Sequence, residues 1–222
     1  MDRFGYTSLK EMRAVPAEEL LEKFKAEGMG LFRPHIDGIL LRESFDDAAR
    51  NRHLADANYM IGCTLDDLND RWQQDVLELK PDILSVLIGT NDVADYIKHR
   101  DDPKGFDTIR WETPYRNLLS WARAINPSLK IALGTPFVSK TTPQSQQELC
   151  ARLAAAVRWI AKDFNAVVMP FDDLFHELQQ SHPNTRYWIW DAVHPTAAGH
   201  KRMADLWISK ATEAGWLIGN NP

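Results

Sequence analysis

The stretch Asp82–Asp92 (DILSVLIGTND) decides the fold of this chain. Its first part, 83–88, is short, β-branched and apolar at nearly every position. That pattern is typical of a central parallel strand covered on both faces. A polar turn follows, and it carries Asn91. Parallel sheets bind ligands beyond the carboxyl ends of their strands, so we expect Asn91 to lie at a ligand site.

Length and composition predict a globular protein with one large domain, with or without an appended segment. The chain has 222 residues, enough to bury a sizeable core, and is 44% hydrophobic and 26% charged. Its net charge of −5, with scattered Lys and Arg, argues against nucleic acid or an anionic membrane as partner. Cys63 and Cys150 are too few for a disulfide framework and suit a reducing cytosol. No stretch has the length of a signal core or a membrane span, so we expect a cytoplasmic protein.

Hydrophobic periodicity and breaker residues predict an alternation of strands and helices. This alternation predicts an α/β fold, a three-layer open parallel sheet flanked by helices. Residues 97–113 are polar and are expected to be irregular. Helices are expected over 8–27, 45–54, 70–80, 114–125, 144–164, 173–180 and 195–214, strands over 39–41, 59–63, 83–88 and 166–170, and a strand followed by a loop over 130–137.

Two motifs that lie far apart in the sequence resemble one enzyme family. Gly89-x-Asn91-Asp92 and Asp191-x-x-His194-Pro195 resemble the third and fifth sequence blocks of the SGNH (GDSL-type) esterases and lipases. The resemblance runs from about residue 69 to residue 210. It implies the flavodoxin-like sheet of the SGNH hydrolases and an ester-hydrolysing activity.

The first part of the chain resembles a different family. Met12–Leu21, Pro34–Gly38 and Tyr59–Thr64 look like a segment from the second half of type-B carboxylesterases. In that family the segment carries neither the nucleophile nor the catalytic histidine. We therefore predict a carboxylesterase-like segment, residues 1–68, that completes the sheet with an atypical first strand and helix. Residues 69–222 would form the SGNH hydrolase-like core, so the chain looks like a fusion of two esterase fragments.

An aspartate and a histidine three residues apart are the candidate base system. Asp191 can accept a hydrogen bond from one ring nitrogen of His194 and leave the other facing a nucleophile. The alternative is a surface Asp next to a His that caps the helix beginning near Pro195. Trp188 and Trp190 could wall an acyl pocket, or they could be ordinary core or surface tryptophans.

Asn91 and Gly62 are the candidate oxyanion donors. Asn91 is a side-chain donor at the end of a strand, although Asn also favours turns for its own sake. The resemblance implies that a backbone N–H at a Gly ending an earlier strand is the second donor, and Gly62 occupies that place. The same Gly also fits the carboxylesterase-like pattern, where it would only end a strand. Asp92 is expected to cap the helix that follows it.

The sequence contains no family-type nucleophile motif. Neither the Gly-Asp-Ser of SGNH enzymes nor the Gly-x-Ser-x-Gly elbow of α/β-hydrolases is present. Ser44 follows the expected strand 39–41 and precedes a short helix, so it is the predicted nucleophile, although it could simply cap that helix. Ser139 is the second candidate. Cys63 could serve in principle, but nothing nearby would obviously lower its pKa.

The sequence thus predicts an ester hydrolase that acts on small acyl or acetyl esters through a Ser-His-Asp mechanism. Its partner would be a small-molecule ester, with no cofactor and no metal, and the oligomeric state is left open. The alternative is a non-catalytic SGNH-fold protein that lost its nucleophile in the fusion and at most binds ligand. The missing Gly-Asp-Ser is the feature that favours the alternative.

Overall fold

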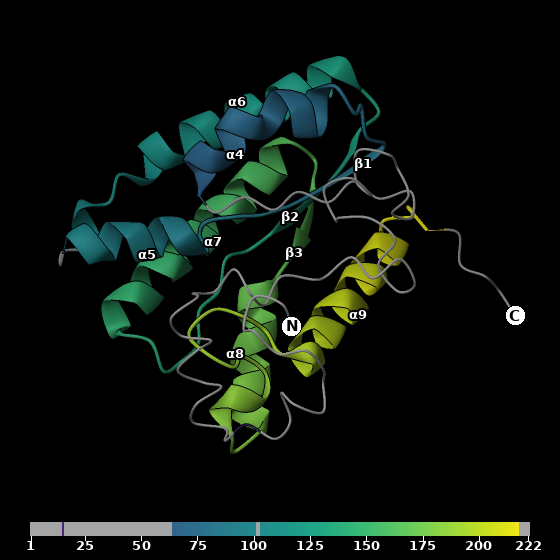
Figure 1. Cartoon of the computed structure of the whole chain (residues 1–222). Coiled ribbons are helices and arrows are strands. Elements are labelled where there is room, and N and C mark those ends of the chain that lie inside the picture. The colour runs from purple at the N-terminus through teal and green to yellow at the C-terminus, as the bar shows by residue number, and fades with distance from the viewer. Residues whose placement is uncertain (1–14, 16–63, 101–102, 218–222) are drawn as a thin grey trace, which may run out of the picture. The chain divides into compact units, whose positions relative to one another are not determined.

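The computed structural model describes residue 15, residues 64–100 and residues 103–217, and those from 64 onward belong to one compact unit (Figure 1). Several predictions lie outside the described residues. They are the helices over 8–27 and 45–54, the strands over 39–41 and 59–63, and the site residues Ser44, Gly62 and Cys63.

The sheet of the described chain has three parallel strands in the order β1-β2-β3. They are β1 (Ile83–Leu87), β2 (Lys130–Gly134) and β3 (Val167–Met169). Leu84 of β1 lies opposite Ile131 of β2, and Leu133 lies opposite Val168 of β3. The predicted α/β fold with a parallel sheet is confirmed. The three predicted strands that fall on described residues all form, and the strand and loop predicted over 130–137 appear as β2 followed by a loop from Thr135.

Helices connect and flank these strands. Thr64 caps the first of them through a capping box with Asp67, and a turn of π-helix extends it. The elements are α4 (Leu65–Trp72), η3 (Gln73–Leu77), α5 (Thr90–His99), η4 (Pro103–Gly105), α6 (Thr108–Ile125), α7 (Gln144–Asp163), α8 (Phe171–Ser181), η5 (Thr185–Tyr187) and α9 (Ala197–Glu213).

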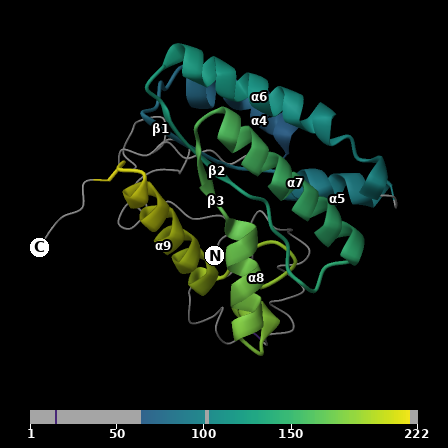
Figure 2. The ribbon, with the colours of Figure 1, turned by 180° about the vertical axis from the view of Figure 1, so that it is seen from behind.

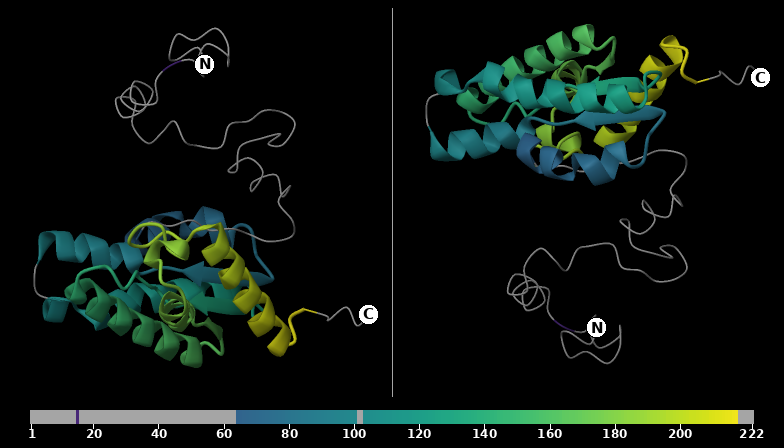
Figure 3. Two further views of the ribbon diagram at one scale, coloured as in Figure 1. Left: turned by 90° about the horizontal axis from the view of Figure 1, so that it is seen from below. Right: turned by 90° about the horizontal axis from the view of Figure 1, so that it is seen from above.

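The sheet separates two hydrophobic cores, which gives the three predicted layers. Leu84, Val86 and Leu133 point to one face and pack with buried residues of α4, α6 and α7. Ala132 and Met169 point to the other face and pack with α8 and α9. In Figures 1 and 2, α4 and α6 accordingly lie on the side away from α8 and α9. Figure 3 shows the strands lying among these helices from two further directions.

Among the described residues, strand β1 has one buried face and one exposed face. Leu84, Val86 and Ile88 are at most 4% exposed, whereas Leu87 is 41% exposed and Ser85 is also exposed. Among the described residues β1 pairs only with β2, so it lies at the end of their sheet and not in its centre. Among the described residues, α8 and α9 pack mainly against β2 and β3, and the Trp207 Nε1–H donates to the Ser85 hydroxyl of β1 at 3.2 Å, so cover on both faces of β1 stays a prediction.

Helix α6 also begins earlier than predicted. The prediction placed Pro114 in the first turn, but the helix starts at Thr108 and holds Pro114 in its interior. Asp107 caps it by accepting the Arg110 N–H at 2.9 Å. Trp111, in the added first turn, is buried in the core, and its packing offsets the cost of an interior proline. Residues 108–113, part of the stretch that was expected to be irregular, are thus helical.

Candidate active site

Asp191 and His194 form a locally closed hydrogen-bond network in the loop before α9. The Asp191 Oδ2 atom lies 2.7 Å from His194 Nδ1, which donates to the carboxylate. The other carboxylate oxygen, Oδ1, accepts the backbone N–H groups of Val193 and His194, both at 2.8 Å. The three-residue spacing therefore lets one carboxylate hold both the imidazole and the backbone that carries it.

The charge state of Asp191 suits an orienting group. Partial burial alone would raise the pKa of this carboxyl, but hydrogen bonds from the backbone of His194 and Val193 and from the His194 ring lower it overall. Asp191 is therefore ionised at neutral pH. The His194 side chain is 67% exposed, and its Nε2 atom forms no hydrogen bond with the described residues. This nitrogen is available to take a proton from a nucleophile.

Backbone bonds fix the loop on either side of this pair. Ile189 and Pro195 form an antiparallel bridge, and the Trp190 N–H donates to the His194 carbonyl at 3.1 Å. Thr196 caps α9 by accepting the Gly199 N–H at 3.2 Å. The alternative role for His194, as the cap of this helix, is therefore wrong. Gly199 itself is required because a side chain there would collide with the Trp188 carbonyl.

Asn91 lies in the first turn of α5, just beyond the carboxyl end of β1. The turn is possible because Gly89 takes a left-handed backbone with φ of 118°, and a Cβ there would lie 3.1 Å from Pro136 Cγ. The Thr90 hydroxyl donates to the Phe137 carbonyl at 3.1 Å and ties the turn to the loop after β2. Asn91 itself is exposed.

One pocket of about 200 Å³ brings the predicted base and the predicted oxyanion donor together. It lies between the carboxyl end of β1, the loop after β2 and the start of α9, as expected for a ligand site at the edge of a parallel sheet. It is lined by Leu87, Ile88, Gly89, Thr90, Asn91, Phe137, Val193, His194, Pro195, His200 and Met203.

His200 and Met203 line this pocket although sequence reasoning did not place them there. Both lie on the first turns of α9, and the His200 ring is held by the Thr196 carbonyl, 3.0 Å from Nδ1. The signal that could have found them is their spacing. Residues 196, 200 and 203 share one helix face directly after the loop that carries His194.

Asp92 has a different role from the predicted one. Its Oδ1 atom accepts the Leu65 N–H at 3.1 Å and the Trp111 Nε1–H at 3.0 Å, so it supports the start of α4 and not the start of its own helix. Its Oδ2 atom is buried and has no partner among the described residues. Burial raises the pKa of Asp92 despite these bonds. Gly89 occupies the cap position of α5, where it offers no side chain.

Neither Trp188 nor Trp190 lines the pocket with His194. Trp190 is 58% exposed, and its ring centroid lies 5.9 Å from that of His194 in a stacked arrangement. Trp188 is partly buried and packs against the core between α8 and α9. Among the described residues, the interpretation as ordinary tryptophans, one at the surface and one in the core, is therefore confirmed. The interpretation as walls of an acyl pocket is not.

The second nucleophile candidate, Ser139, has a structural role. Its side chain is 1% exposed, and its hydroxyl donates to Gln179 Oε1 at 3.1 Å. It does not line the pocket with His194. Cys150 is a buried free thiol, and its burial raises the pKa to about 12. Neither group is therefore placed to act as a nucleophile.

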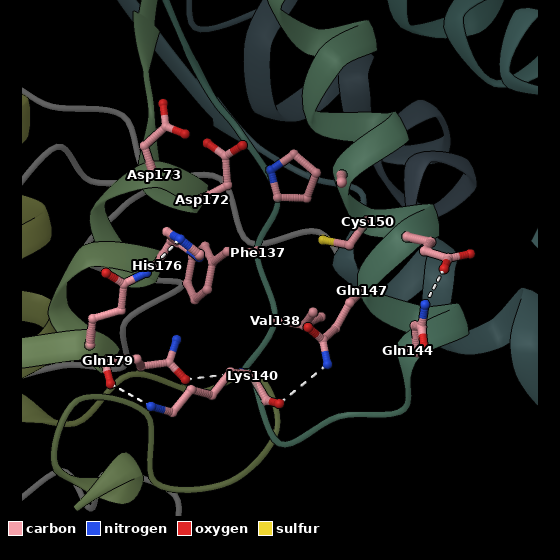
Figure 4. A pocket seen from close by; sticks show the side chains of 14 residues that line it. Phe137, Val138, Lys140, Gln144, Gln147, Cys150, Asp172, Asp173, His176 and Gln179 are labelled. Atoms are coloured by element: carbon pink, nitrogen blue, oxygen red, sulfur yellow. Dashed lines mark hydrogen bonds between the residues drawn. The ribbon is translucent and has the colours of Figure 1, made fainter. Parts of the chain in front are cut away.

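A larger hollow, of about 660 Å³, lies between α7 and α8 (Figure 4). Phe137 separates it from the pocket with His194, since both hollows have this residue in their walls. The larger hollow contains neither His194 nor Asn91, so we take the smaller pocket as the candidate active site. In residues 64–100 and 103–217, no three His, Cys, Asp or Glu gather as a metal site would require, and no helix is long and apolar enough to cross a membrane.

At the carboxyl edge of this parallel sheet, His194 lines one small pocket with Asn91 and is paired with Asp191, an arrangement that suits a three-layer α/β protein of the acylhydrolase type. Residues 40–202 match the GDSL-like Lipase/Acylhydrolase family, and the chain belongs to this family. The match reaches back into the stretch that resembles a type-B carboxylesterase, and that second resemblance stays a prediction.

Similar proteins of known character agree with this assignment. The chain is 32% identical to an acetylxylan esterase from Geobacillus stearothermophilus over 151 residues, 66% of this chain and 67% of the relative. A crystal structure of an acetylxylan esterase from that organism superposes with a TM-score of 0.59 at 27% identity, covering 71% of each chain. A protein from Parabacteroides merdae described as GDSL-like gives a TM-score of 0.60 at 28% identity, covering 67% of this chain and 68% of the other.

Proposed function

We propose that this protein hydrolyses small acyl or acetyl esters, carbohydrate esters among them, by a Ser-His-Asp mechanism. One observation carries the proposal. The Asp191–His194 pair is formed, with the carboxylate on Nδ1, and His194 lines the same pocket as Asn91. A base, its orienting group and an amide donor are three of the components that acyl transfer needs.

In the proposed reaction, His194 Nε2 takes the proton of a serine hydroxyl as that oxygen attacks the ester carbonyl. Asp191 holds the ring in the required tautomer and stabilises the imidazolium that forms. The Asn91 side-chain N–H groups donate to the oxyanion. His194 then returns its proton to the leaving alcohol, and a water molecule activated by the same ring hydrolyses the acyl-enzyme.

Ser44 is the proposed nucleophile and the Gly62 N–H the proposed second oxyanion donor. Both residues lie outside the described chain, so their support comes from sequence. The family match begins at residue 40, which puts Ser44 near its start. In addition, solved variants of the Geobacillus acetylxylan esterase described as catalytic mutants replace a serine, a histidine or an aspartate by alanine.

The proposal also requires residues 1–68 to complete the sheet beside β1, where Ser44 could reach His194. Two features of β1 support this arrangement. It pairs only with β2 among the described residues, and Ser85 and Leu87 leave one of its faces exposed. Limited proteolysis followed by mass spectrometry tests it. We expect no stable fragment beginning near Leu68, and a folded fragment of 69–222 would show that the first part is an appendage.

The size of the pocket favours a small acyl group. Its volume of about 200 Å³ lies below the range of about 300–1,000 Å³ that is typical of ligand pockets. A long acyl chain would exceed this volume, whereas an acetyl group needs only a fraction of it. The alcohol part of the ester would then lie outside the pocket, as it would in an acetylated sugar.

Turnover of p-nitrophenyl acetate, with and without a serine-directed fluorophosphonate, tests the proposal. We expect saturable release of p-nitrophenol that the fluorophosphonate abolishes, with p-nitrophenyl octanoate hydrolysed more slowly. A folded protein that releases no more p-nitrophenol than its His194→Ala variant would favour the non-catalytic alternative, a protein that only binds ligand.

A further inference from the structure

The loop that carries Asp191 and His194 is attached to the rest of the fold through the carbonyl of Ala192. The Ser139 N–H donates to this carbonyl at 2.7 Å. The same peptide unit ends in the Val193 N–H, which donates to Asp191 Oδ1 at 2.8 Å. Because a peptide unit is planar, fixing its carbonyl also fixes the direction of its N–H. Ser139 therefore determines how the Asp191 carboxylate is held.

Gln179 in turn fixes the backbone at Ser139. Its Oε1 atom accepts the Ser139 hydroxyl at 3.1 Å and the Lys140 N–H at 3.0 Å. Its Nε2 atom donates to the Phe175 carbonyl, one turn earlier on α8, at 3.0 Å. The Lys140 ammonium also donates to the Gln179 carbonyl at 2.6 Å, and Figure 4 shows both links between Gln179 and Lys140. The side-chain amide of Gln179 thus makes three hydrogen bonds within the protein.

Burial makes these bonds costly to lose. Gln179 is 3% exposed and Ser139 is 1% exposed, so water cannot readily replace either partner. A buried polar group left without a partner costs about 1–3 kcal/mol. Gln is rare at buried positions unless its hydrogen bonds are satisfied, and the core around α8 would otherwise favour an apolar side chain here. The position therefore has a specific polar role.

We propose that Gln179 is a positioning residue for the proposed hydrolase, acting through Ser139 and Ala192 on the Asp191–His194 pair. This inference rests on the proposed function for its kinetic consequence, but its structural consequence does not depend on turnover. The chain of contacts runs from the Gln179 amide to the backbone of Ser139 and Lys140. It continues through the Ala192–Val193 peptide to the Asp191 carboxylate and so to His194 Nδ1.

Gln179→Met tests the link, because Met keeps the side-chain length and removes both the acceptor and the donor. Gln180→Met is the matched control, since Gln180 is the next residue on α8 and is exposed. Gln179→Glu is the conservative variant, because it keeps acceptor oxygens for Ser139 and Lys140. Circular dichroism and thermal melting establish that each variant is folded.

Two NMR measurements on the full chain do not depend on turnover. We expect the Val193 amide to exchange about tenfold faster in Gln179→Met, as for the loss of one hydrogen bond, and the downfield His194 Nδ1–H signal to weaken. Gln180→Met should leave both unchanged, and Gln179→Glu should restore most of both. Wild-type exchange at Val193 with a wild-type His194 signal in folded Gln179→Met would overturn the inference.

The kinetic measurement separates this inference from the proposed function. If the protein turns over p-nitrophenyl acetate, Gln179→Met should lower kcat by about tenfold to a hundredfold with KM nearly unchanged, because the substrate still binds beside a misplaced base. A protein without turnover would contradict the proposed function and leave the NMR result to decide the role of Gln179.

If Gln179→Met does not fold, Ser139→Ala removes one bond to Gln179, and unchanged Val193 exchange in that variant would overturn the inference.

Discussion

The loop of residues 188–196 and the turn of residues 89–92 both deliver a side chain to the candidate active site, and they are built in opposite ways. In the loop, the direct partners of Asp191 lie two and three residues away, in Val193 and His194, and the Ser139 N–H adds one distant contact through the Ala192 carbonyl. The turn depends on distant residues. Asp92 bonds to Leu65 and Trp111, which are 27 and 19 residues away.

The two aspartates show what this difference does to charge. Asp191 is held by three donors, and its pKa is lowered overall. Asp92 has one buried oxygen that finds no partner in the part of the chain the structure describes, and desolvation raises its pKa. A carboxylate near the surface with local donors can therefore serve as a charged orienting group. A carboxylate that is buried between helices lowers the stability of the fold and has a structural role.

Replacing His194 should have the largest effect, because it removes the base of the locally built loop. If the protein turns over p-nitrophenyl acetate, His194→Ala should reduce kcat by at least about 10³, since a triad acts as a unit. His200→Ala is the matched control in the same pocket and should cost far less. A His194→Ala variant that kept about a tenth of wild-type activity would exclude His194 from the mechanism.

Replacing Asn91 should have a smaller effect, because the turn supplies one donor and not the base. Asn91→Ala should lower kcat by about 10²–10³ with KM little changed, as loss of one oxyanion donor does. Asn91→Asp keeps the side-chain shape without the donor and should be at least as slow. A change confined to KM would instead mean that Asn91 binds the ground-state substrate.

The smallest effect should come from Asp92 and concerns stability. Because the pKa of folded Asp92 is raised above its ordinary value of 3.8, the folded state binds the proton more tightly than the unfolded state. This residue therefore makes the fold less stable as pH rises from about 4 through the raised pKa. Each unit of pKa shift corresponds to about 1.4 kcal/mol.

Asp92→Asn should remove this contribution while its Oδ1 still accepts from Leu65 and Trp111. Urea unfolding from pH 4 to pH 7 should show the variant gaining stability relative to the wild type as pH rises. Asp95→Asn, on an exposed position of the same helix, should show no such trend. If the difference in unfolding free energy between the wild type and Asp92→Asn stayed constant from pH 4 to pH 7, Asp92 would titrate normally.

The same contrast explains what the sequence could predict. The Asp191–His194 pair was predictable because three residues of spacing fix its geometry. The place of Asn91 was predictable because an apolar strand followed by Gly puts it at the edge of a parallel sheet. The partners of Asp92 were not predictable, because they come from helices whose packing no local pattern encodes. The turn chemistry around Gly89 favoured a cap by Asp92, but tertiary packing overrode it.

The elements of the fold were likewise predictable where a local sequence pattern determines them. The strands β1, β2 and β3 and the helices α7, α8 and α9 lie within a few residues of their predicted places, because their apolar periodicity is strong. The start of α6 was missed because Pro114 is a strong local start signal, whereas burial of Trp111 extends the helix upstream. Which elements cover the second face of β1 was not predictable, because a run of apolar residues does not say which neighbours cover it.

Mapping the site of a fluorophosphonate adduct by mass spectrometry tests the central claim, that this protein is a serine hydrolase with His194 as its base. We predict a single adduct on Ser44 in the wild type, none in Ser44→Ala, and much slower labelling in His194→Ala. Labelling of another serine at an undiminished rate in His194→Ala, or a folded wild-type protein that takes up no label, would contradict it.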